Sequence, residues 1–383
     1  MISASEARVV SLQTYTRQPA AGRAHRRPAD LHQHPSTPPN LAGNMPGDDA
    51  SAVIREIDVA DGTAQAYQPH REPEGRAGRV AAVAEFIRRR LTGDYNVDEF
   101  GFDPHFNDAI AMPMLRPLFN KWFRVDVTGI ENLPDTGAAL VVANHAGVLP
   151  LDALMISVAV HDKHPAHRTL RTLAADMVFD TPVLGSAARK AGHTLACVGD
   201  AHRLLSNGEL AAVFPEGYKG LGKCFKDRYR LKRFGRGGFV SAALRAKAPI
   251  IPCSVIGSEE VYPMLGDLRP IARLLGLPYF PITALFPLAG PIGLIPMPSK
   301  WHIEFGSPIP TSKFSDSAPE DAMLTFELTD QVRETIQRTI YRLLRQRRNT
   351  LLGSTVRRRK RHAAQWTPWC RRWRSRWPRT PSA

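Results

Sequence analysis

A histidine and an aspartate follow one apolar stretch of this chain at a spacing that could support proton transfer. Residues Ala138 to Ala143 are apolar and predict a buried strand, which delivers Asn144 and His145 to its end. Pro150 suits the first position of a following helix that would carry Asp152. Reactive groups of open α/β sheets gather at the carboxyl ends of strands, where a carboxylate can hold a histidine base in one tautomer. A core strand followed by an incidental histidine explains this stretch equally well.

A second apolar stretch also ends in a charged turn. Residues Leu210 to Phe214 predict another buried strand, and Pro215 leads out of it. Glu216 can accept hydrogen bonds from hydroxyls, Gly217 allows close backbone approach, and Lys219 can meet an anion. Taken alone, this turn could be a loop with an exposed glutamate.

Together, the two turns resemble the lysophospholipid and glycerol-phosphate acyltransferase family, whose marks are an NH-x4-D turn and an FPEG turn. Three further segments match family patterns: Phe234-Gly235-Arg236-Gly237-Gly238, Pro249-Ile250-Ile251-Pro252 and Phe305-Gly306-Ser307-Pro308-Ile309. The resemblance covers about residues 100 to 345. It looks closest to the neutral-lipid branch, which is similar to mono- and diacylglycerol acyltransferases.

The resemblance implies transfer of a fatty acyl group from a thioester, usually acyl-CoA, to a hydroxyl of a glycerol-based lipid. His145 would act as the general base, and Asp152 would orient and stabilise its imidazole. No cofactor beyond the co-substrate acyl-CoA and no metal is expected. The residues expected to hold the substrates are Asn144, Glu216, Gly217 and Lys219, with Arg236 as a candidate for phosphate or CoA.

Two departures from the family pattern bear on these assignments. The spacing is H-x6-D and not H-x4-D: Pro150 stands where the family pattern has its aspartate, and Asp152 follows two residues later. On one continuous helix, residues seven apart lie about 20° short of two turns, but Pro150 leaves His145 outside the helix. We expect the His145–Asp152 pair, with Asp152 as a simple helix N-terminal carboxylate the alternative. The stretch Gly192 to Asp200 lacks the arginine of phosphate-recognising members, which argues against a phosphorylated acceptor.

Strands and helices alternate along the chain at α/β spacing. The apolar runs predict strands over 125–129, 138–143, 170–175, 194–198, 210–214, 249–256 and 301–305. Helical periodicity predicts helices over 79–93, 112–123, 151–160, 181–192, 200–207, 237–246 and 318–347. We therefore predict the α/β class, with a mostly parallel central sheet covered by helices.

The charge of the chain is concentrated at one end. The formal net charge is +15, and the segment from Arg342 to Ala383 holds 13 Arg and 1 Lys without any Asp or Glu, so it carries nearly all of it. We predict a disordered segment over 1–78, one catalytic domain over 79–347 and a basic Trp/Arg-rich tail over 348–383. The tail favours an anionic membrane surface, whereas a nucleic-acid patch and a non-functional tail are the alternatives. We expect no specific nucleic-acid partner.

Two segments raise the question of membrane contact. The stretch 276–298 is apolar but holds six prolines, which argues against a spanning helix and favours a hydrophobic tunnel wall, an interfacial loop or ordinary core. The helix over 112–123 is expected to pack against the sheet, with contact to a bilayer the alternative. With no apolar signal segment, we expect a cytoplasmic protein bound peripherally at the inner face of the membrane. The scattered cysteines are expected to be reduced.

Two other functions remain open on the residues alone, and a third, nucleotide hydrolysis, is disfavoured. A thioesterase or lipid hydrolase could use the same histidine with water in place of the acceptor. A non-enzymatic membrane or nucleic-acid binder could act through the basic tail. Residues Gly217 to Cys224 come within one residue of a phosphate-binding P-loop, but Cys224 lacks the hydroxyl that such a loop uses to bind magnesium.

Overall fold

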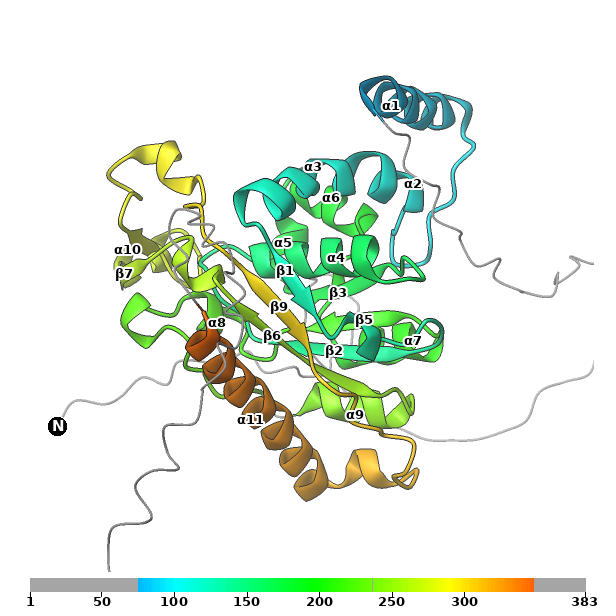
Figure 1. Cartoon of the computed structure of the whole chain (residues 1–383), viewed down its shortest axis with the longest axis vertical. Helices are drawn as coiled ribbons and strands as arrows, with labels where there is room; N and C mark the ends of the chain where they lie inside the picture. The colour runs from blue at the N-terminus through cyan, green and yellow to red at the C-terminus, as the bar shows by residue number, and fades with distance from the viewer. Residues whose placement is uncertain (1–74, 236, 348–383) are drawn as a thin grey trace, which may run out of the picture.

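The structure is a computed structural model and describes residues 75–235 and 237–347 (Figure 1). Most of the predicted N-terminal disordered segment and the whole predicted basic tail, together with Arg236 and Cys370, therefore lie outside the described residues. The first described helix, α1 (Gly75–Thr92), begins four residues before the predicted start of the catalytic domain. Cys197, Cys224 and Cys253 are free thiols, as expected.

A seven-stranded sheet forms the centre of the protein, in the order β1-β9-β6-β2-β5-β3-β4. Its strands are β1 (Asp126–Thr128), β2 (Ala139–Ala143), β3 (Leu170–Ala174), β4 (Thr194–Leu195), β5 (Leu210–Val213), β6 (Ile250–Ile256) and β9 (His302–Phe305). The strands from β6 to β4 are parallel, whereas β9 pairs with β6 in the antiparallel sense and β1 follows β9. The predicted class and mostly parallel sheet are confirmed.

Helices cover both faces of this sheet (Figure 1). One face packs against α4 (Leu151–Lys163) and the helical segment 104–122, and the other packs against α7 (Val198–Ser206), α9 (Gly238–Arg245) and α11 (Ala322–Gln346). Every residue of β2 is buried, with Val141 facing the first layer and Val142 the second. A strand covered on both faces must be apolar throughout, which is why its sequence shows no alternation.

The helical segment before the sheet is built from short consecutive pieces. They are α2 (Pro104–Phe106), the π-helix η1 (Asn107–Ala111), α3 (Met112–Pro117) and the π-helix η2 (Leu118–Trp122). Met112, Phe119 and Phe123 are buried in the core beside α4. The prediction that residues 112–123 pack against the sheet is therefore confirmed.

Two predicted elements are wrong in their boundaries. The helix expected over 181–192 is replaced by α5 (Asp176–Asp180) and α6 (Leu184–Lys190). Val183 adopts a φ of 66°, outside the helical region, so α6 cannot begin before Leu184. The strand expected over 194–198 ends as β4 at Leu195, because α7 already begins at Val198.

The proline-rich stretch 276–298 belongs to a small lobe beside the main sheet. This lobe contains a second, two-stranded sheet of β7 (Met264–Asp267) and β8 (Pro281–Thr283), together with α10 (Arg269–Leu274) and the 3-10 helix η6 (Gly290–Leu294). In the part of the chain that the structure describes, no helix is both long enough and apolar enough to cross a membrane. The segment is irregular, as its prolines predict.

Candidate active site

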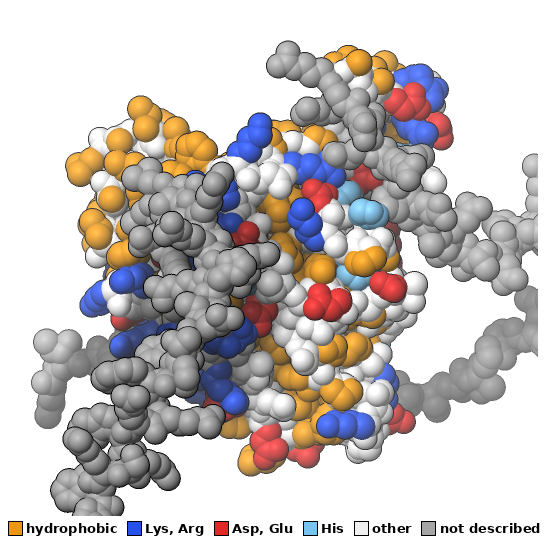
Figure 2. All heavy atoms as spheres, viewed as in Figure 1, with side chains coloured by type: hydrophobic (Ala, Val, Ile, Leu, Met, Phe, Trp, Pro, Cys, Tyr) orange, Lys and Arg blue, Asp and Glu red, His pale blue; other side chains and the backbone are white. Residues whose placement is uncertain are grey.

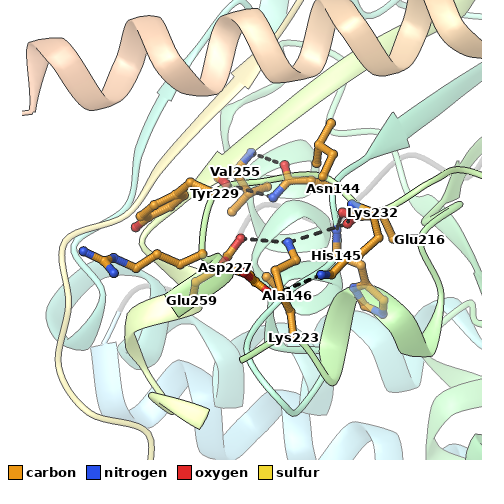
Figure 3. Close-up of polar contacts among 12 residues, drawn as sticks. Asn144, His145, Ala146, Glu216, Lys223, Asp227, Tyr229, Lys232, Val255 and Glu259 are labelled. Atoms are coloured by element: carbon orange, nitrogen blue, oxygen red, sulfur yellow. Dashed lines mark hydrogen bonds and ion pairs between the residues drawn. The ribbon is translucent and has the colours of Figure 1, made fainter. Parts of the chain in front are cut away.

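The two polar turns lie side by side at one edge of the sheet. Strands β2 and β5 are parallel neighbours, with Val142 opposite Val213, so their carboxyl ends point the same way. His145 follows the first strand and Glu216 follows the second, and the two residues are joined by a hydrogen bond (Figure 3). The sheet thus brings together residues that are far apart in the sequence.

His145 and Asp152 form a buried pair. Nδ1 of His145 lies 2.9 Å from Oδ2 of Asp152, and the aspartate is completely buried. The carboxylate also accepts hydrogen bonds from the backbone N–H groups of Ala146 and Ala153, each at 2.9 Å. An ionised carboxylate can only accept hydrogen bonds, so the pairing places the imidazole proton on Nδ1 and leaves Nε2 with a free lone pair.

The longer H-x6-D spacing is absorbed by a tight turn. Gly147 has a φ of 100° and Val148 a φ of 63°, so the chain folds back before α4 begins at Leu151. A Cβ on Gly147 would lie only 2.6 Å from the carbonyl oxygen of Ser258, which explains the glycine. The turn, and not a shared helix face, brings Asp152 to His145.

Asn144 fixes the start of this turn to the neighbouring strand. Its amide donates to the carbonyl oxygen of Val255 at 3.0 Å and accepts from the N–H of Val255 at 2.7 Å (Figure 3). The residue is 1% exposed. The sequence assigned Asn144 to substrate binding, but here its amide is engaged with β6.

Glu216 is engaged in the same way with the protein's own backbone. Oε1 accepts from the N–H of His145 at 3.1 Å, and Oε2 accepts from the N–H of Lys232 at 2.6 Å. The side chain is fully buried, and the preceding Phe214 packs its ring against the His145 imidazole, with 4.5 Å between centroids. Glu216 therefore holds the backbone of His145, which the hydroxyl-binding hypothesis did not anticipate.

Of the other predicted substrate-binding residues, the structure describes Gly217 and Lys219. Gly217 caps the short helix α8 (Tyr218–Leu221) with a φ of 53° and a ψ of −143°, a conformation suited to glycine. Lys219 is exposed on that helix. Arg236 falls outside the described residues, so its predicted contact with phosphate or CoA stays a prediction.

Two charged residues missed by the sequence analysis complete the network. The Lys223 ammonium lies 3.1 Å from Oε1 of Glu259 and 3.5 Å from Oε2 of Glu216, and its side chain is 2% exposed (Figure 3). Burial raises the pKa of Glu259, and the nearby Glu216 adds to this, while Lys223 opposes it. Glu259 follows β6, which runs parallel to β2 and ends on the same side of the sheet. A charged residue shortly after a predicted strand was the signal in the sequence that could have identified Glu259.

A small hollow lies beside the turn that joins His145 to Asp152. Its walls include Gly147 and Val148 from the first turn and the paired Lys223 and Glu259. No group of His, Cys, Asp and Glu among the described residues has the arrangement to hold a metal ion. Because Asp152 engages Nδ1 of His145, the pair can support proton transfer through Nε2, beside a buried charge network.

Comparison with known proteins identifies relatives over most of the chain. The family model "Acyltransferase" matches residues 124–256. An uncharacterized protein of Mycobacterium tuberculosis is 64% identical over 351 residues, which cover 91% of this chain and 98% of that protein. An uncharacterized protein of Mycobacterium leprae is 63% identical over 86% of this chain and 92% of its own length.

More distant similarities reach characterised proteins. The "DGAT1/2-independent enzyme synthesizing storage lipids" of Bos taurus is 28% identical over 49% of this chain and 53% of that protein. The crystal structure of the 1-acyl-sn-glycerophosphate acyltransferase of Thermotoga maritima aligns with a TM-score of 0.46 at 18% identity, over 70% of this chain and 92% of that one. The residues that the family model matches include both polar turns. The mycobacterial relatives align with this chain over nearly their whole length. The chain belongs to the lysophospholipid and glycerol-phosphate acyltransferase family.

Proposed function

We propose that this acyltransferase moves a fatty acyl group from acyl-CoA to a hydroxyl of a glycerol-based lipid, with His145 as the general base. Nε2 of His145 takes the hydroxyl proton as the oxygen attacks the thioester carbonyl. The new C–O bond forms, the C–S bond breaks, and the proton passes to the departing CoA sulfur. Asp152 stabilises the imidazolium that exists between the two proton transfers.

The observation that supports this mechanism most is the hydrogen bond of 2.9 Å between His145 and the fully buried Asp152. It fixes the tautomer that a base at Nε2 requires. Direct attack needs no acyl-enzyme, because the acceptor hydroxyl itself is activated.

A neutral acceptor, such as a mono- or diacylglycerol, fits this chain better than a phosphorylated one. The stretch Gly192 to Asp200 lacks the arginine found in phosphate-recognising members of the family. The distant bovine relative carries a name that refers to storage lipids, which supports the same choice. We place the enzyme peripherally at the inner face of the membrane, where both the thioester and the lipid are accessible.

The proposal is tested by an acceptor screen with the full-length protein. Isotope-labelled acyl-CoA is supplied with lysophosphatidic acid, glycerol 3-phosphate, monoacylglycerol or diacylglycerol, and products are identified by mass. We expect an acylated neutral glyceride from the wild type and none from His145→Ala, with both proteins showing the same circular dichroism. Equal turnover by His145→Ala contradicts the mechanism.

The same screen separates the competing functions. A hydrolase releases free fatty acid at a rate that does not depend on any acceptor. Replacing acyl-CoA with an acyl carrier protein thioester tests the donor, because product from the carrier alone contradicts acyl-CoA dependence. A binder that acts only through its basic tail yields no product, and truncation after Arg347 would abolish its binding.

A further inference from the structure

The lobe over residues 264–299, hereafter the apolar lobe, exposes an unusual number of aliphatic side chains. Leu274 is 84% exposed and Leu288 is 91% exposed. Other aliphatic side chains of the lobe that are more than a third exposed are Leu265, Ile271, Leu275, Leu277, Leu285, Ile292, Leu294 and Ile295. Hydrophobic side chains gather over this lobe at the upper left of Figure 2, where Figure 1 draws β7 and α10. Contiguous exposed apolar surface of this kind marks an interaction site.

The distribution of charge shows what kind of partner this surface fits. From Leu274 to Ser299 the sequence contains no Asp, Glu, Lys, Arg or His. The exposed Arg269 and Arg273 lie on α10 at one end of the uncharged stretch, where Arg269 is 3.7 Å from Asp267. At the other end follows Lys300, which pairs with Asp126 at 2.6 Å. An uncharged apolar surface with cations at its border matches the interface of a bilayer, whose anionic head groups surround an apolar interior.

An aromatic residue from another element adds to this border. Trp122, at the end of η2, is 39% exposed, and its indole N–H donates to the carbonyl oxygen of Pro296 at 2.9 Å. The exposed Lys121 stands next to it. Tryptophan and lysine at the rim of an apolar surface are typical of groups that sit at the level of the head groups.

The apolar lobe is joined directly to the catalytic turn. The Tyr279 hydroxyl donates to the carbonyl oxygen of Val148, which lies between His145 and Asp152 in the sequence. The Tyr262 hydroxyl, on the wall of the hollow, donates to the carbonyl oxygen of Leu294. A bilayer in contact with the lobe would therefore adjoin the residues that surround the pair.

We propose that the apolar lobe inserts shallowly into the surface of an anionic phospholipid bilayer. Leu274, Leu288 and their neighbours enter the acyl region while Arg269 and Arg273 meet lipid phosphates. The lobe contains no spanning helix, and its backbone stays at the interface, where water and head groups can satisfy its polar groups. The role of the lobe in supplying a lipid acceptor rests on the proposed function, whereas membrane binding does not.

The test compares two paired substitutions in the full chain. Leu274→Glu with Leu288→Glu places two charges on the lobe, and Met323→Glu with Phe326→Glu places two on exposed positions of α11. Binding is measured by co-sedimentation with phosphatidylcholine vesicles with and without phosphatidylglycerol. We expect the lobe variant to bind anionic vesicles roughly tenfold more weakly, and the α11 variant to bind like the wild type.

Further arms separate the possible outcomes. His145→Ala should bind vesicles like the wild type, so loss of acyl transfer and loss of binding remain distinguishable. Unchanged vesicle binding by the lobe variant overturns the proposal. If the lobe variant instead converts a wild-type dimer to a monomer in analytical ultracentrifugation with vesicle binding unchanged, the surface contacts a second copy and the membrane role is wrong.

Discussion

Asp152 and Glu216 are both buried carboxylates that contact His145, but they hold different parts of it. Asp152 contacts the imidazole at Nδ1, whereas Glu216 accepts the backbone N–H of the same residue. Asp152 also accepts the backbone N–H groups of Ala146 and Ala153, and Glu216 accepts that of Lys232. Only Glu216 has a buried cation beside it, the Lys223 ammonium at 3.5 Å.

This difference separates a carboxylate that faces a charge developing on the imidazole during catalysis from one whose neighbouring charge stays constant. A histidine base needs a carboxylate that stabilises its imidazolium form, and among the described residues the hydrogen bonds of Asp152 go to His145 and to two backbone N–H groups, not to a Lys or Arg cation. The charge of Glu216 is compensated by Lys223 throughout. We therefore expect changes at Asp152 to affect turnover most and changes around Glu216 to affect stability most.

Asp152→Asn should cause the larger loss of turnover. The NH₂ group of an asparagine would face one of the N–H groups whose hydrogen bonds Asp152 now accepts. The neutral asparagine side chain could also no longer stabilise an imidazolium. We expect kcat to fall by roughly a hundredfold or more, with KM little changed. Steady-state kinetics with acyl-CoA checks this, and a loss confined to KM would speak against an orienting role.

Lys223→Met should cause the largest loss of stability. It leaves Glu259 and Glu216 buried without their cation, and breaking such a pair costs about 3 kcal/mol. Urea unfolding measures the change. Because burial raises the pKa of Glu259 from 4.5, the deficit should shrink as the pH falls toward 4.5 and Glu259 becomes neutral.

The matched control for this prediction is Lys223→Met combined with Glu259→Gln. Removing one uncompensated carboxylate should recover part of the lost stability at neutral pH. A double variant that is less stable than Lys223→Met would show that the cation does not act through Glu259.

Glu216→Gln should lower both stability and turnover by smaller amounts. One oxygen becomes an NH₂ group facing either the His145 or the Lys232 N–H, which leaves a buried donor unsatisfied at a cost of about 1–3 kcal/mol. The backbone of His145 would shift, so we expect about a tenfold lower kcat at a temperature where the variant is folded. A hundredfold loss of kcat in a stable variant would instead favour the contact with substrate expected from the sequence.

The smallest predicted effect concerns pH and the helix that carries Asp152. Burial alone would lower the pKa of His161 on α4, but Asp108 and Asp162 outweigh it and raise the pKa from 6.5 to about 9. A raised histidine pKa stabilises the fold fully below pH 6.5, and this contribution is lost as the pH rises through about 9. Urea unfolding at both ends of this window should show the loss in the wild type and a flatter profile in His161→Gln. If the stability of the wild type and that of His161→Gln change with pH in the same way, the prediction is wrong.

Much of the fold could be predicted because its central strands are apolar over their whole length. The runs that became β2, β5 and β6 stand out in the sequence, and their turns carry His145 and Glu216. The antiparallel placement of β9 between β1 and β6 could not be predicted, since its short run encodes no partner or direction.

The sequence placed His145, Asp152 and Glu216 in one candidate site, but not the contacts that hold them there. The contact between His145 and Asp152 depends on backbone angles at Gly147 and Val148 that the H-x6-D spacing does not reveal. Lys223 follows α8, Glu259 lies in the 3-10 helix Ser258–Glu260, and the two meet only in the folded chain. The contacts of Glu216 with the N–H groups of His145 and Lys232 could not be predicted, because they are made to the backbone, which no side-chain pattern records.

His145 and Asp152 are expected to act as one catalytic unit, and a double-mutant cycle on kcat measures the coupling between them. His145→Ala should lower the rate by about 10³-fold, and adding Asp152→Asn should then cost little more, because the imidazole it serves is already absent. The rates of wild type, both single variants and the double variant are measured with the same acyl-CoA and acceptor. If the two losses multiply in the double variant, the residues act independently and the account is wrong.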